Sequence, residues 1–362
     1  MDLDRLATSL VVIGFDGHAA PPEALELLDR GVSGAILFKR NVGSPAETAG
    51  LCASLKRRAA RSFLLCVDQE GGRVARLREG FPALPPMRRL GELGDDRLAE
   101  RAGRLLGEEC RSVGFDLDFA PVVDVDSNPL NPVIGDRSFG SDPGLCGRLG
   151  AALLRGLQSA GVAGCAKHFP GHGDTVQDSH ATLPRLPHGI DRLRAVELPP
   201  FAALVRADVA TIMTAHVVFE ALDPGLPATF SEKALGLLRR ELGFGGVVIS
   251  DDLEMAAIAE RWPLDEAAVR SVTAGCDLLL VCHQPERQSA AIDGLRRAAE
   301  KSSAVRERLQ QAASRVAALA SRWAAPPAPF DPARLRQPWI EELASALGGP
   351  TGPLRDPTSA AG

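Results

Sequence analysis

Residues 167–180 gather the side chains best suited to move protons or to hold a polar ligand. This segment, KHFPGHGDTVQDSH, contains three His, two Asp and one Lys among Gly and Pro. It follows the apolar run 161–166, and a protein core does not tolerate so many unpaired polar groups. We therefore expect a site here, in which Asp178 and His180 form an acid/base pair. Lys167 and His168 are expected to hold a polar ligand.

Two adjacent carboxylates end another apolar run. In the motif SDDL, residues 250–253, Asp251 and Asp252 follow the strand-like residues 247–249. An Asp before Leu-Glu-Met-Ala-Ala is a good helix N-cap, which accounts for one carboxylate only. Because neighbouring strand residues point to opposite faces, we expect one Asp to cap a helix and the other to point into a site.

Residues 68–74, DQEGGRV, indicate a second polar rim. Asp68 ends a strand, and the Gly pair turns the chain so that Arg76 can return to the same edge. Carboxylates accept hydrogen bonds from sugar hydroxyls, and Arg donates them in a planar fork. An internal Asp–Arg ion pair that only holds the loop remains the alternative, and the two roles can coexist.

Residues 134–139, IGDRSF, provide a further cation on a loop. Arg137 is the candidate ligand group here, and Asp136 is expected to hold it. An ion pair that only fixes the loop is again the alternative. His216 closes another strand and has a weaker claim, since such a His is often only hydrogen-bonded structure.

Metal binding is a competing interpretation of the His-rich segment. Five side chains in it are potential ligands, namely His168, His172, Asp174, Asp178 and His180. However, no helical His-Glu-x-x-His or comparable spacing supports a metal. The seven Cys never form Cys-x-x-Cys, so we interpret them as reduced core residues. We predict no metal and no cofactor.

The composition indicates an ordinary globular protein. Of 362 residues, 45% are hydrophobic and 24% charged, and the net charge of -5 offers no basic surface for nucleic acid. Residues 1–10 lack the basic and apolar regions of a signal peptide, and no run approaches the ~20 apolar residues that span a bilayer. We expect a cytoplasmic protein that binds neither nucleic acid nor membranes.

Short apolar runs alternate with helical patterns along the chain. The strand candidates are residues 11–15, 34–38, 63–68, 116–120, 161–168, 211–216, 247–251 and 277–282. Eight strands alternating with helices predict an α/β fold, a single (β/α)8 or TIM barrel. An open doubly wound sheet is the runner-up, but the first turn lacks its Gly-rich loop. In a barrel, the polar residues at the strand ends would share one rim.

The C-terminal part breaks this pattern. Residues 1–325 are expected to form the catalytic barrel. Residues 326–347 are expected to form a linker and a short helix packed on the barrel, a C-terminal helical extension. Residues 348–362 are rich in Gly, Pro, Thr and Ser and predict a disordered tail.

Four motifs in this order resemble the signature of family-3 glycoside hydrolases, most closely their β-N-acetylhexosaminidase branch of peptidoglycan recycling. In their order along the chain they are DQEGGRV, IGDRSF, KHFPGHGDT followed by DSH, and SDDL. The similarity spans about residues 9–320. It implies a retaining hydrolase on a (β/α)8 barrel that acts on a β-linked N-acetylglucosamine of a muropeptide, a small-molecule carbohydrate.

The resemblance also assigns roles to residues. Asp251 matches the nucleophile, His180 the general acid/base, and Asp178 its partner. A second set matches positions that bind the terminal N-acetylglucosamine: Asp68, Arg76, Arg137, Lys167 and His168. Retaining hydrolysis needs one carboxylate to attack the sugar and one proton donor, and the His–Asp dyad would replace the usual second carboxyl group.

Several alternatives stay open. A phosphorylase of the same substrates, a β-glucosidase-type member, a muropeptide-binding sensor and a metal-dependent hydrolase share parts of the pattern. The oligomeric state is expected to be a monomer or a weak homo-oligomer.

Overall fold

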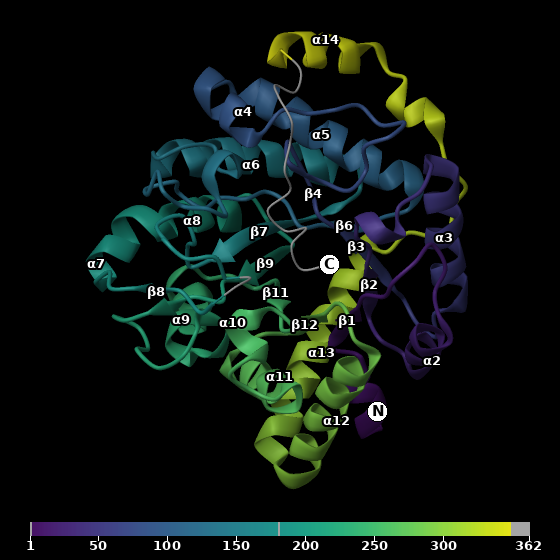
Figure 1. The fold of residues 1–362 in the computed structure, drawn as a ribbon, viewed down its shortest axis with the longest axis vertical. Coiled ribbons are helices and arrows are strands. Elements are labelled where there is room, and N and C mark those ends of the chain that lie inside the picture. Colours follow the sequence, from purple (N-terminus) through teal and green to yellow (C-terminus); the bar gives the residue numbers. More distant parts are fainter. Residues whose placement is uncertain (1, 180–181, 349–362) are drawn as a thin grey trace.

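Eight parallel strands close into a barrel in the computed structural model, which describes residues 2–179 and 182–348 (Figure 1). They follow one another around the barrel in sequence order and are β1 (Val11–Ile13), β2 (Gly34–Ile36), β3 (Leu64–Val67), β6 (Leu117–Asp118), β7 (Ala163–Phe169), β9 (Thr211–Thr214), β11 (Val247–Asp252) and β12 (Leu278–Val281). The predicted barrel is therefore confirmed, and the open sheet is wrong.

Helices surround the barrel and connect its strands. They are α2 (Pro22–Arg30), α3 (Pro45–Arg58), α5 (Asp96–Val113), α6 (Pro143–Ser159), α8 (Leu198–Arg206), α9 (Glu232–Gly236), α11 (Leu264–Ala274) and α12 (Pro285–Lys301). Local signals fix their ends. Asp95 caps the start of α5 through Arg97 N at 2.8 Å, and Gly114 ends it with a φ of 100° that suits glycine.

Shorter helices and strands lie in the segments at the two ends of the barrel. Helix α1 (Leu3–Thr8) precedes β1, α4 (Met87–Leu93) precedes α5, and α7 (Ile190–Arg192) and α10 (Ala256–Ala259) lie on loops. Strands β4 (Gln69–Gly71) and β5 (Val74–Ala75) form an antiparallel hairpin directly after β3. Strands β8 (Arg185–Leu186) and β10 (Val218–Phe219) pair in parallel.

The barrel strands are buried on both faces. Val12 points into the barrel and packs with Leu64, Leu117 and Leu280, whereas its neighbours Val11 and Ile13 belong to the layer under the helices. The alternation follows from the strand period of two, and both faces are apolar because helices cover the outer one. The seven cysteines are buried and free, as predicted.

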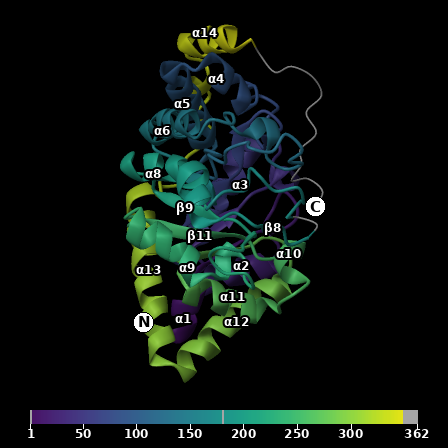
Figure 2. The ribbon, with the colours of Figure 1, turned by 90° about the vertical axis from the view of Figure 1, so that its left-hand side faces the viewer.

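A long helix covers the amino-terminal ends of the strands. Helix α13 (Ser303–Trp323) contributes Val316, Leu319, Ala320 and Trp323 to the same apolar cluster as the barrel interior. Figure 2 shows it running along the face opposite to β8 and α10. The carboxyl-terminal ends of the strands therefore remain for a site.

The C-terminal extension crosses the outside of the barrel. Helix α14 (Pro338–Leu347) lies over α5, where Arg101 donates to Trp339 O at 2.7 Å (Figure 1). Gly348, the first residue of the predicted tail 348–362, ends α14, and residues 349–362 lie outside the described residues. Within the described part of the chain, no helix is long and apolar enough to cross a membrane.

Candidate active site

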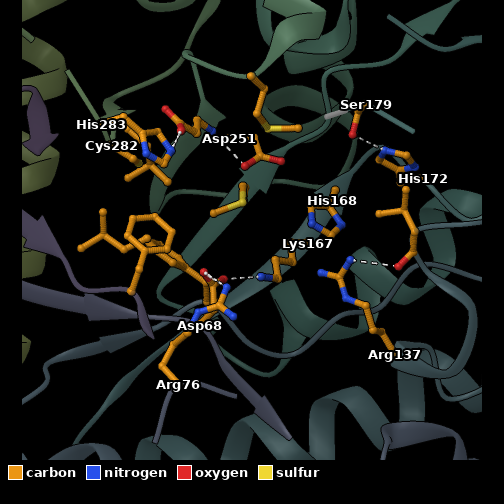
Figure 3. Close-up of a pocket in the computed structure, with 18 of the residues that line it drawn as sticks. Asp68, Arg76, Arg137, Lys167, His168, His172, Ser179, Asp251, Cys282 and His283 are labelled. Carbon is orange, nitrogen blue, oxygen red and sulfur yellow. Dashed lines mark hydrogen bonds and ion pairs between the residues drawn. The ribbon is translucent and has the colours of Figure 1, made fainter. Parts of the chain in front are cut away.

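A cavity of about 480 Å³ opens at the carboxyl-terminal ends of the barrel strands. Six residues predicted from the sequence line it: Asp68, Arg76, Arg137, Lys167, His168 and Asp251. Apolar side chains of Phe38, Val133, Met213 and Met255 fill the spaces between them. The sequence prediction that these polar strand ends share one rim is correct, and Figure 3 shows them around a common space.

The β4–β5 hairpin brings Arg76 back to Asp68, as predicted. Arg76 Nη2 lies 3.4 Å from Asp68 Oδ2, and Lys167 Nζ lies 2.8 Å from Asp68 Oδ1 (Figure 3). Gln69 stabilises the returning chain, because its Oε1 accepts from Arg76 N at 2.9 Å. The Asp68 side chain is 15% exposed, so it can form the ion pair and still contact a ligand in the cavity.

Glu70 joins two of the predicted cations beneath the cavity. Arg137 holds it with a two-pronged contact of 2.8 and 2.7 Å, and Lys167 Nζ lies 2.7 Å from Glu70 Oε1. Burial acts to raise the pKa of Glu70, but the two cations outweigh burial and lower that pKa well below its ordinary range. Burial likewise opposes the charge of Lys167, whose pKa is nevertheless raised by Asp68 and Glu70.

This arrangement corrects the expected role of Asp136. The sequence predicted that Asp136 holds Arg137, but Asp136 Oδ1 instead lies 2.7 Å from Arg73 Nε. Arg137 belongs to a short 3-10 turn, Gly135–Arg137, which points its side chain inward to Glu70 while Asp136 stays at the surface. Adjacent positions of such a turn face different directions, so sequence proximity did not identify the partner.

His168 is held by a carboxylate that the sequence analysis missed. Its Nδ1 lies 2.7 Å from Asp124 Oδ2, and the same carboxylate accepts from His172 N at 2.7 Å. Burial would raise the pKa of Asp124, but His168 and the hydrogen bonds lower it overall. Asp124 thus orients the ring so that its other nitrogen can serve a ligand. Both Lys167 and His168 line the cavity because the β7–β9 register shifts between Ala166 and Phe169.

The segment that leads to the predicted dyad lies at the cavity wall. Ser179 Oγ lies 2.9 Å from His172 Nε2, and both side chains line the cavity (Figure 3). Burial lowers the pKa of His172 to about 4, and nearby His168 acts in the same direction. Asp178 precedes this contact, whereas His180 lies outside the described residues. The Asp178–His180 dyad therefore stays a prediction.

Asp251 and Asp252 both line the cavity, and neither caps a helix. The N-cap of α10 is Met255, three residues further along than the interpretation of the sequence required, so that interpretation is wrong. The register of β11 with β12 shifts between Ile249 and Asp252, which turns both carboxylates toward the opening. Asp252 N donates to Asp251 Oδ1 at 2.8 Å, and this hydrogen bond favours an ionised Asp251.

Two further histidines surround this turn. His216 is buried and its Nε2 lies 3.0 Å from Asp252 O, so it supports the backbone and does not line the cavity. His283 received no functional claim from the sequence, yet it lines the cavity and its Nε2 lies 3.2 Å from Asp252 Oδ2. Its position immediately after the β12 strand candidate was the available signal.

No three His, Cys, Asp or Glu side chains within residues 2–179 and 182–348 gather in a way that would hold a metal ion. The polar groups of the cavity are arranged instead as hydrogen-bonded networks around the carboxylates of Glu70, Asp124 and Asp252. Such networks present fixed donors and acceptors to a polyhydroxylated ligand.

Comparison with known proteins identifies the family. The model of the glycosyl hydrolase family 3 N-terminal domain matches residues 4–319. The chain belongs to glycosyl hydrolase family 3. This match covers every barrel strand and every cavity residue described above.

Family-3 relatives and structures resemble the chain over most of its length. A beta-hexosaminidase of Thiobacillus denitrificans is 43% identical over 72% of this chain and 74% of its own length. One of Stenotrophomonas maltophilia is 41% identical over 78% of this chain and 86% of its own length.

Among solved structures, a family-3 β-N-acetylglucosaminidase of Paenibacillus has a TM-score of 0.89 and 41% identity, covering 96% of this chain and 68% of that one. NagZ of Neisseria gonorrhoeae, in complex with N-trifluoroacetyl-D-glucosamine, has a TM-score of 0.79 and 34% identity, covering 94% and 97%. These matches confirm that the chain is a glycosidase, and they support the β-N-acetylhexosaminidase class predicted from its motifs.

Proposed function

We propose that this family-3 enzyme removes terminal β-linked N-acetylglucosamine from muropeptides by retaining hydrolysis through a covalent glycosyl-aspartate. The observation that carries the proposal is the position of Asp251, whose carboxylate lines the cavity opposite the Asp68–Lys167–Arg137 network. A nucleophile on one side and a set of hydroxyl-binding groups on the other is what attack on a bound sugar requires. The solved Paenibacillus β-N-acetylglucosaminidase and the Neisseria gonorrhoeae complex with N-trifluoroacetyl-D-glucosamine support N-acetylglucosamine as the sugar.

In the first step, the Asp251 carboxylate forms a bond to the anomeric carbon while the bond to the leaving oxygen breaks. His180, as an imidazolium oriented by Asp178, gives that oxygen its proton. In the second step, neutral His180 takes a proton from water, the water oxygen bonds to the anomeric carbon, and Asp251 leaves. The backbone N–H of Asp252 supports this cycle because it stabilises the ionised form of Asp251.

The remaining cavity residues hold the sugar in this proposal. Asp68 accepts hydrogen bonds from hydroxyl groups, and Arg76, Lys167 and His168 donate to oxygens of the ring substituents. Arg137, which also lines the cavity, donates to the sugar and in addition fixes Glu70 and thereby the position of Lys167. A cytoplasmic role in peptidoglycan recycling fits a muropeptide substrate and is part of the proposal.

Covalent trapping tests the nucleophile directly. Incubation with a fluorinated N-acetylglucosaminyl donor, followed by peptide mass spectrometry, should locate an adduct on Asp251. Asp251→Ala should lose roughly 10⁴-fold or more in turnover of an aryl β-N-acetylglucosaminide, the scale of loss of a catalytic nucleophile. Azide should restore part of the turnover and give the α-glycosyl azide. An adduct on another residue, or a released sugar of inverted configuration, would contradict the mechanism.

Phosphorolysis is the second candidate, because a His acid/base carries no negative charge that would repel a phosphate acceptor. Product analysis with and without phosphate separates the two reactions. Free N-acetylglucosamine in both conditions supports hydrolysis, whereas the sugar 1-phosphate would establish phosphorolysis.

A further inference from the structure

The turn that carries the proposed nucleophile is held by a histidine on the loop after the neighbouring strand. His283 follows β12, and its Nε2 lies 3.2 Å from Asp252 Oδ2. Asp252 in turn donates its backbone N–H to Asp251 Oδ1 at 2.8 Å. Only one residue therefore separates His283 from the carboxylate that would attack the sugar.

His283 is itself fixed from three directions. Glu254 accepts from its backbone N at 2.5 Å. Its ring stacks on Phe38, with centroids 5.7 Å apart and planes 25° apart, and Arg40 lies over the same Phe38 ring at 4.4 Å. Arg40 Nη2 also donates to Cys282 O at 2.8 Å. The imidazole thus belongs to a rigid wall made by the loops after β2, β11 and β12.

We propose that His283 is a positioning residue for the proposed nucleophile: its imidazolium holds Asp252, and Asp252 directs its backbone N–H to Asp251. The inference rests on the proposed function of Asp251. The cation also balances the negative charge of Asp252, the carboxylate directly next to Asp251 in the chain. A neutral imidazole would hold Asp252 less firmly, because a hydrogen bond between two charged groups is the stronger kind.

The charged groups around His283 support its protonation. The hydrogen bond with Asp252 raises the pKa of His283, while burial and the positive charge of Arg40 act in the opposite direction. Glu254, from the same turn as Asp252, also raises the pKa of His283. Arg287 on α12 lies 4.0 Å from Glu254 and offsets part of that effect. The net result is a pKa above the ordinary value, so the imidazolium persists to higher pH than in an isolated histidine.

The experiment isolates the step in which Asp251 attacks. A 2,4-dinitrophenyl β-N-acetylglucosaminide has a leaving group that needs no proton, so kcat/KM reports the attack without the contribution of His180. In wild type, kcat/KM should fall as pH rises through the raised pKa of His283. His283→Phe, which retains a ring to stack on Phe38, should lower kcat/KM by ~10-fold at pH 6, the effect of one lost charged hydrogen bond. The kcat/KM of this variant should also no longer decrease as the pH rises.

Two companion variants keep the outcome interpretable. His283→Asn retains a donor without a charge, so it should recover part of the rate at pH 6, and its kcat/KM should likewise not decrease as the pH rises. His18→Asn replaces an exposed histidine that does not line the cavity, and its profile should match wild type. A wild-type rate with an unchanged pH profile in both His283 variants would overturn the inference.

Covalent trapping separates this inference from the function on which it rests. If the fluorinated donor labels a residue other than Asp251 in wild type, the proposed function fails. If it labels Asp251 in His283→Phe as fast as in wild type, only the role of His283 fails. Slower labelling of Asp251 in the variant supports both. Titration of the His283 ring by NMR should further show a lower pKa in Asp252→Asn than in wild type.

Discussion

Arg137 is a buried residue to which the proposed function gives both a sugar-binding and a structural role. Its fork on Glu70 fixes the carboxylate that also holds Lys167, so the positions of both cations depend on the same partner. We predict that Arg137→Ala raises KM for an aryl N-acetylglucosaminide by ~10–100-fold, the effect of losing a hydrogen bond to a charged group, with a small change in kcat. Steady-state kinetics measures this split. Arg137→Lys retains the positive charge without the two-pronged contact, so its KM should lie between those of wild type and Arg137→Ala. An unchanged KM in Arg137→Ala would restrict Arg137 to a structural role.

His180 makes a different prediction at the same scale. Because a general acid acts only in the transition state, His180→Ala should lower kcat by ~10²–10⁴-fold for a poor leaving group and affect binding weakly. A 2,4-dinitrophenyl leaving group needs no proton, so its release should slow far less. Parallel kinetics on the two substrates tests this, and an equal loss on both would speak against a proton-donating role.

At the scale of elements, the β4–β5 hairpin depends on a buried contact with α5. Gln69 lies between Asp68 and Glu70, and its Nε2 donates to Glu109 Oε2 at 2.7 Å and to Leu77 O at 3.1 Å. Within the part of the chain that the structure describes, no cation pairs with Glu109, and burial raises the pKa of its carboxyl to about 8. The helix therefore supports the β4–β5 hairpin through a carboxyl group that is protonated at neutral pH.

This raised pKa predicts a pH-dependent stability. Between pH 4.5 and 8 the unfolded chain loses the Glu109 proton and the folded chain keeps it, so the free energy of unfolding falls as pH rises through this window. Glu109→Gln removes the titration, and its stability relative to wild type should improve by a few kcal/mol (~1.4 kcal/mol per pH unit) from pH 5 to pH 8. Urea unfolding at several pH values measures this. The matched control is Glu108→Gln, because the Glu108 carboxylate is paired with Arg334. The free energy of unfolding of this control should depend on pH as in wild type. The same pH dependence in Glu109→Gln would refute the prediction.

The elements were easier to predict than their side-chain partners. Each barrel strand is a short apolar run bounded by polar residues, a local property that the sequence displays directly. Asp68 and Lys167 were found because both end such runs, and the closed barrel brings those ends together. Glu70 and Asp124 were missed because their partners lie 67 and 44 positions away along the chain. The N-cap interpretation of the Asp251–Asp252 pair failed because a register shift in β11 is not visible in residue types.

For the whole molecule, the two ends of the barrel have separate tasks. The carboxyl-terminal end holds the cavity, while buried ion pairs and α13 close the other end. Asp116 precedes β6 and accepts from Lys56, Arg111 and the backbone N of Ala325, which ties the C-terminal extension to the barrel. The first residues of the extension are therefore attached at the end that is remote from the cavity.

Asp277, before β12, is the strongest test of this division. Its fully buried carboxylate contacts Arg239, Arg308 and Arg315 and accepts from Val248 N at 3.0 Å. Asp277→Ala leaves three cations without their shared partner, so we expect it to destabilise the fold by ~3–5 kcal/mol, as loss of one member of a buried ion pair does. Asp29→Ala breaks a half-exposed pair with Arg58 and should cost no more than ~1 kcal/mol. Denaturant unfolding gives both values.

KM and kcat of the folded Asp277→Ala enzyme should match wild type, because these contacts lie at the opposite end of the strands from the cavity. A raised KM with unchanged stability would mean that the two ends are coupled.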